Sequence, residues 1–130
     1  METKYIGIRT NLGCKVLKET EDPEEMKVLD LRLDLWNHSP SGLEWGYSGS
    51  GPAQTALALL ADATGNDRLA VALHQQLKFE RVAGFSKEGF ELTADEIRRW
   101  VDEHKGKLDL SDWEEEAQDL DSDDSDHAHE

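Results

Sequence analysis

The sequence predicts an α+β domain, in which a small antiparallel sheet packs on about three helices. Two short β-prone runs lie on either side of a glycine turn, a third run alternates leucine with charged residues, and three helical patterns follow. The chain has 130 residues, the length of one domain. We therefore expect residues 1–106 to form the globular domain and residues 107–130 to be an acidic, largely disordered tail.

The predicted sheet begins with a hairpin. Residues 4–10 and 14–20 are β-prone, and the short connection between them ends in Gly13, which suits a positive φ. In residues 28–36, leucine alternates with charged side chains. Because successive side chains of a strand point to opposite faces, this pattern predicts a half-buried strand whose leucine row lies on the helices.

Three helices are predicted after this strand. Residues 52–63 form an almost wholly apolar helix, which belongs in the core, and Gln54 is expected to reach back and cap its start. A second helix runs over residues 67–82, behind a glycine stop. The third follows the capping box Thr93-Ala94-Asp95-Glu96, and residues 90–92 are assigned only as the lead-in to it.

Composition indicates the compartment and the class of partner. One cysteine excludes an internal disulfide, and no apolar run forms a signal peptide or a membrane span, so we expect a cytoplasmic protein that binds no membrane. Residues 1–101 carry 12 Lys+Arg and 16 Asp+Glu, whereas residues 102–130 carry 2 and 13. Such a tail repels nucleic acid and attracts basic proteins, so direct nucleic-acid binding is not expected. The tail acids singled out for this role are Asp119, Asp121, Asp123, Asp124 and Asp126.

A dense group of aromatic and polar residues lies just before the apolar helix. Trp and Tyr are favoured anchors in binding surfaces. The candidate binding surface consists of Trp36, His38, Glu44, Trp45, Tyr47, Ser48 and Ser50. An alternative stays open, in which Trp45 and Tyr47 are core residues while His38 and Glu44 fix the loop.

The glycine-rich elbow at residues 46–54 suggests a second type of site. Its glycine spacing matches a phosphate loop, but Pro52 and Ala53 replace the lysine and the hydroxyl that such a loop needs, so nucleotide hydrolysis is disfavoured. A weak anion site at the N–H groups of Ala53 and Gln54 remains as an alternative to a purely structural elbow.

No catalytic residue is assigned. Ser48 or Ser50 with His38 as base is conceivable, but the nucleophile-elbow pattern is incomplete, and loop serines beside glycine more often form caps and turns. His127 and His129 lie in the acidic tail, where flexible ligands hold a metal weakly. No metal and no cofactor is expected.

The run SPSGLEWGYSGSGPAQTALALL, residues 39–60, resembles the signature of an uncharacterised prokaryotic family, a domain of unknown function with an SPxGxEWGYxGSGPAQxALAxL core. The resemblance covers roughly residues 28–101 and departs at Ser48 and Thr55, where Gly and Leu are expected. It implies no particular activity.

These observations favour a small, acidic, non-enzymatic module that binds a protein partner. The surface between Trp36 and Tyr47 contacts the partner, and the tail steers the protein toward a basic one. One specific form is an inhibitor that imitates nucleic acid. One alternative is a small-ligand or anion-binding domain at residues 46–54, with a catalytic use of the same elbow ranked after it. Another is a structural accessory domain whose tail only keeps it soluble. The oligomeric state is left open.

Overall fold

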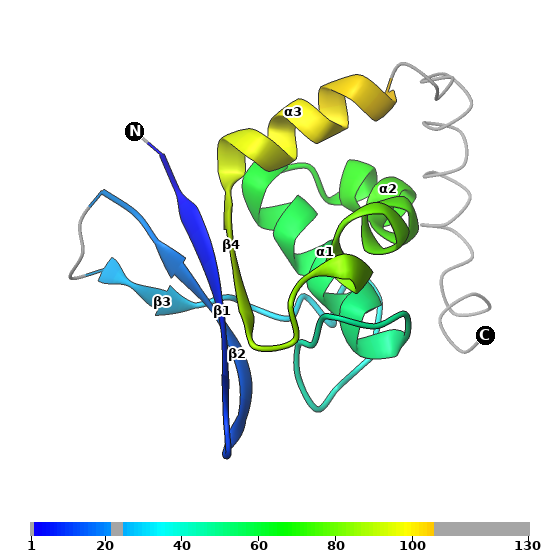
Figure 1. Cartoon of the computed structure of the whole chain (residues 1–130). Coiled ribbons are helices and arrows are strands. Elements are labelled where there is room, and N and C mark those ends of the chain that lie inside the picture. The colour runs from blue at the N-terminus through cyan, green and yellow to red at the C-terminus, as the bar shows by residue number, and fades with distance from the viewer. Residues whose placement is uncertain (1, 22–24, 106–130) are drawn as a thin grey trace.

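The computed structural model describes residues 2–21 and 25–105 (Figure 1). Its strands are β1 (Lys4–Thr10), β2 (Gly13–Glu19), β3 (Lys27–Val28) and β4 (Gly89–Thr93), and its helices are α1 (Ser50–Thr64), α2 (Asp67–Glu80), the short 3₁₀ helix η2 (Val82–Gly84) and α3 (Ala94–Lys105). The strands form one antiparallel sheet in the order β3-β2-β1-β4. The predicted α+β class is therefore confirmed. The predicted tail lies outside the described residues.

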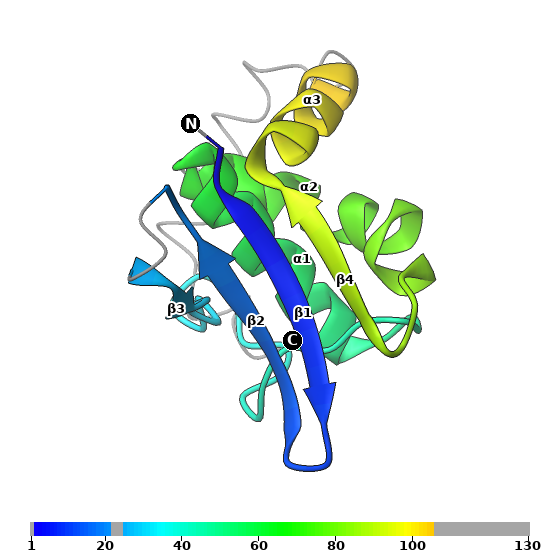
Figure 2. The ribbon, with the colours of Figure 1, turned by 60° about the vertical axis from the view of Figure 1, so that its left-hand side comes forward.

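The helices cover one face of the sheet, and Figure 2 shows the sheet from its other side, in front of the helices. Tyr5, Val16 and Leu92 point from the sheet into the helical side and are 0%, 0% and 3% exposed. Side chains at intervening positions point the opposite way. Ile8 and Val28 lie on that outer face, where they are 38% and 58% exposed.

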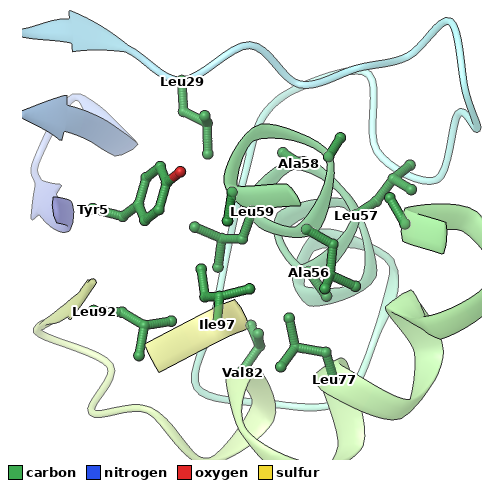
Figure 3. Packing of buried hydrophobic residues seen from close by; sticks show 14 of the residues in the cluster. Tyr5, Leu29, Ala56, Leu57, Ala58, Leu59, Leu77, Val82, Leu92 and Ile97 are labelled. Carbon is green, nitrogen blue, oxygen red and sulfur yellow. The ribbon is translucent and has the colours of Figure 1, made fainter. Parts of the chain in front are cut away.

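Helix α1 is the centre of the core. Every residue from Gly51 to Ala61 is buried, as expected for a helix that is apolar nearly all round. Figure 3 shows Leu59 beside Tyr5 of the sheet and Ile97 of α3. The helix ends at Gly65, which has a φ of 66° and donates its N–H to the Ala61 carbonyl at 2.9 Å. The predicted buried helix and its glycine stop are thus confirmed.

The predicted strand over residues 28–36 is wrong. Only its first residue pairs with β2, and the Leu29 N–H still reaches the Val16 carbonyl at 2.8 Å. The chain then turns at Arg32, whose φ of 57° is left-handed and incompatible with a strand. The Arg32 guanidinium fixes this turn, because it forms 3.0 Å ion pairs with Asp34 and with Asp67 at the start of α2.

A strand replaces the predicted lead-in at residues 90–92. Strand β4 pairs with β1, with Phe90 opposite Gly7 and Leu92 opposite Tyr5. Gly7 makes this pairing possible, since a Cβ there would lie 2.3 Å from the Phe90 ring. The strand leads directly into the capping box of α3, which is confirmed: Thr93 Oγ1 accepts the Glu96 N–H, and Glu96 Oε1 accepts the Thr93 N–H, each at 3.0 Å.

Candidate functional site

The structure divides the candidate surface into two groups. Two consecutive buried residues of α1, Gln54 and Thr55, each hold one of these groups through hydrogen bonds. Trp36 and His38 belong to a loop that Gln54 holds, whereas Glu44 is held by Thr55. Trp45 packs edge-on against Phe90 of β4 and is 0% exposed, which makes it a core residue. The remaining candidates, Tyr47, Ser48 and Ser50, are exposed.

Gln54 clamps the loop that precedes α1. Its Oε1 accepts the N–H groups of His38 and Ser39 at 2.7 and 3.0 Å, and its Nε2 donates to the carbonyls of Leu31 and Trp36 at 2.7 and 2.9 Å. The side chain is fully buried, and both ends of the amide are used. The expectation that Gln54 caps its own helix is therefore wrong. It fixes residues 31–39 instead.

His38 is held against a second histidine from α2. The Nε2 atoms of His38 and His74 lie 2.8 Å apart. His74 Nδ1 lies 2.7 Å from the Val71 carbonyl, which can only accept, so the neutral His74 ring accepts through Nε2 and His38 donates. The Trp36 ring stacks on His38 with a 5.4 Å centroid separation.

The two imidazoles have lowered pKa values. Burial is the main cause for His74, which is 2% exposed, and lowers its pKa to about 4. Burial also lowers the pKa of His38, and the positive charge of Lys78 adds to this effect. Both rings are therefore neutral at pH 7, and the single N–H···N hydrogen bond between them is retained.

Glu44 is the centre of the second group. Arg9 of β1 donates to both of its carboxylate oxygens, at 2.9 and 3.3 Å, and the Cys14 thiol donates to Oε2 at 3.3 Å. Burial opposes the charged form, but the hydrogen bonds from Arg9 and Cys14 outweigh it, so the pKa of Glu44 is lowered. The Arg9 guanidinium also lies 5.4 Å from the centre of the Trp45 ring, a cation–π contact.

The glycine elbow is packed closely against its own loop. A Cβ on Gly51 would lie 2.5 Å from Glu44 Cβ, and one on Gly49 would lie 2.8 Å from the Tyr47 ring. The Ala53 N–H donates to the Gly49 carbonyl at 3.1 Å. The predicted anion site thus has one of its two donors engaged within the fold, and both Ala53 and Gln54 are buried.

Sequence reasoning missed the residues that complete the two groups. Arg9 and Cys14 come from the hairpin, and His74 comes from α2. Only His74 could have been found in the sequence, because it is a polar residue on the apolar face of α2 that also carries Leu73 and Leu77. The other contacts depend on the sheet register, which places Arg9 opposite Cys14.

The described part of the chain has no large pocket and no group of metal-binding side chains that would indicate a further site. A depression of about 170 Å³ lies at α3, below the ~300 Å³ of ordinary small-molecule pockets. Its lining residues are Arg81, Glu96, Arg99, Trp100 and Glu103. Within residues 2–21 and 25–105, no three His, Cys, Asp or Glu side chains cluster as metal ligands. No helix in these ranges is long and apolar enough to cross a membrane.

The fold and the site define a small α+β domain with helices on one face of its sheet and a glutamine-clamped loop before its central helix. The chain belongs to a family of unknown function, DUF6166, whose model matches residues 5–103. This match includes both groups of the candidate site and confirms the resemblance to an uncharacterised domain family. No curated protein and no solved structure matches the chain.

Proposed function

We propose that this protein is a cytoplasmic, non-enzymatic module that binds a basic protein partner. The observation that carries the proposal is the distribution of charge. After Lys107 the sequence has 11 acidic residues and no Lys or Arg, whereas residues 1–101 have 12 Lys+Arg against 16 Asp+Glu. A charge concentrated in this way attracts a partner of opposite sign over about a Debye length, ~10 Å at 0.1 M salt.

The geometry of the body supports a binding role over a catalytic one. The polar groups that chemistry would need are engaged: His38 Nε2 contacts His74, and the Glu44 carboxylate is held by Arg9. Ser48 and Ser50 are exposed, and neither has a hydrogen bond to an imidazole among the described residues. The two groups therefore stabilise the loop.

Tyr47 is the best candidate anchor on the body. It is 45% exposed, yet its ring packs beside Gly49, and its hydroxyl lies close to Gly51. A large side chain held in one orientation loses little entropy on binding, which favours its use in an interface. We infer that Tyr47 contacts the partner while the acidic segment increases the rate of encounter. A partner that binds nucleic acid fits this charge, and the protein then acts as a nucleic-acid mimic.

Affinity capture from extracts of the host tests this proposal. The full chain is immobilised beside a variant in which Asp119, Asp121, Asp123, Asp124 and Asp126 are replaced by Asn. We expect the wild-type chain to retain a basic protein that elutes between about 0.1 and 0.3 M salt, and the variant to retain about tenfold less.

A Tyr47→Ala variant supplies the second arm of the experiment. It keeps the charge, so its retention should fall at all salt concentrations rather than shift the salt at which elution occurs. If the neutralised variant retains the same proteins in the same amounts, the charge is irrelevant to binding and the proposal is wrong.

A further inference from the structure

Lys78 of α2 is a buried lysine without an acidic partner. The residue is 8% exposed, and its Nζ lies 4.3 Å from the centre of the Phe79 ring. Within the described residues it makes no ion pair and no hydrogen bond. Its aliphatic stem accounts for the burial, while a charged ammonium without a protein partner can bind an anion.

The ammonium group of Lys78 is open to solvent. Among the described residues, Trp45 Nε1 is the only fully buried side-chain polar atom that lacks a partner. The Lys78 ammonium has no partner among these residues and is not in this class, so it has access to solvent. An exposed aromatic ring lies beside it, since Phe79 is 65% exposed. A lysine whose stem is buried and whose charge emerges at the surface presents three N–H donors to a ligand.

The residues around the Lys78 ammonium favour a ligand in which a carboxylate lies beside an aromatic or apolar group. His74 lies one turn before Lys78 on α2 and contacts His38 at 2.8 Å, and Trp36 stacks on His38. We name Trp36, His38, Lys78 and Phe79 the Lys78 patch. Its charge comes from a single ammonium, while its remaining area is made of rings, which suits an acidic side chain that adjoins a tryptophan.

The chain carries such a sequence, Asp112-Trp113-Glu114, beginning seven residues beyond the end of α3 at Lys105. The last turn of α3 lies against the last turn of α2, where His104 Nε2 is 2.7 Å from Glu80 Oε1. Eight extended residues beyond Lys105 span up to about 26 Å, more than twice the ~10–12 Å diameter of a helix. That length is sufficient to carry Asp112-Trp113-Glu114 around α2 to Lys78.

We propose that the Lys78 patch binds the C-terminal segment of the same chain, with a carboxylate of Asp112 or Glu114 on the Lys78 ammonium and Trp113 on the Phe79 ring. This goes beyond the proposed function, because it gives the acidic segment an intramolecular site when no partner is bound. A basic partner then competes with Lys78 for the acidic segment.

The test is NMR of the full chain, using the indole N–H signal of Trp113, which Trp113→Phe identifies. In the wild type this signal should differ from that of a free peptide of residues 106–130 and should move toward it as salt is added. Lys78→Gln should lower the ratio of docked to free segment about tenfold. Lys15→Gln, which removes an exposed lysine on the outer face of the sheet, should change nothing.

Unchanged indole signals of Trp45 and Trp100, which lie outside the Lys78 patch, show that the Lys78 variant is folded. If it does not fold, Asp112→Asn combined with Glu114→Gln must release Trp113 instead. A wild-type Trp113 signal at the free-peptide position overturns the proposal, and so does a docked signal that the variants leave in place. A position that depends on protein concentration also overturns it, since the occupant is then a second copy. None of these readouts involves the basic partner.

Discussion

Replacing Gln54 by alanine is expected to lower the free energy of unfolding by about 4 kcal/mol. The change leaves two N–H groups, those of His38 and Ser39, and two carbonyls, those of Leu31 and Trp36, without their partner. Each unpaired buried group costs about 1–3 kcal/mol, and partial access of water to the loop reduces the total. Urea unfolding followed by far-UV circular dichroism measures the difference.

Gln75→Ala is the matched control. Gln75 is an exposed residue of α2, and its replacement should change the free energy of unfolding by no more than about 0.5 kcal/mol. The hydrogen-bonding account of the clamp predicts that Gln54→Met, which keeps the volume, is almost as damaging as Gln54→Ala. A loss below about 1 kcal/mol in either Gln54 variant would contradict the assignment of Gln54 as the clamp.

Acid is expected to destabilise the fold through His74 before it acts on the carboxylates. The pKa of His74 is about 4 in the folded protein and 6.5 in an unfolded chain. Between these values the unfolded state binds a proton that the folded state does not, so stability falls as the pH falls. From pH 7.5 to pH 5 the loss should be about 2 kcal/mol, and His38, whose pKa is also lowered, adds to it.

His74→Gln separates this effect from other titrations. Asp34, Glu44 and Asp95 have pKa values below their usual range, so their contributions to stability are lost only as the pH falls below their unfolded pKa values, near 4. Between pH 7.5 and pH 5 the His74→Gln protein should therefore show a much flatter stability profile, whatever its stability at pH 7.5. Parallel profiles for the two proteins would show that His74 does not titrate in this range.

The helices were the most predictable part of the fold because their signals are local. Gly65 ends α1 and Thr93 pairs with Glu96 at the start of α3, each within a few residues of sequence. Burial of α1 also followed from composition, since a helix without a polar face has no stable place on a surface.

The sheet was less predictable because strand pairing depends on distant residues. Strand β4 is defined by pairing with β1, about 85 residues earlier in the chain, and by Gly7, which leaves room for Phe90. The alternating leucines of residues 28–36 matched a strand pattern, yet the turn at Arg32 and the Gln54 clamp prevailed over it. Both act through side chains whose partners no local pattern reveals.

Most residues of the candidate site could be predicted from the sequence, but the contacts between them could not. The sequence located the aromatic and polar residues before α1, and it left open whether Trp45 belonged to the surface or to the core, where the structure places it. Arg9 and His74 could not be assigned to these groups in advance, because each is brought to its partner by tertiary packing. Among the predicted surface residues, Tyr47 is the aromatic side chain that the structure leaves exposed, at 45%, with its ring beside Gly49.

The most direct test of the central claim, that the protein binds a basic partner by charge-steered association, is the association rate of a captured partner as a function of salt. For the wild type we expect the rate constant to fall steeply as salt rises, and replacement of the five Asp residues between 119 and 126 by Asn to lower it about tenfold near 0.05 M salt, with little change in the dissociation rate. Tyr47→Ala should instead raise the dissociation rate. An association rate that neither salt nor the Asn substitutions alter would contradict the account.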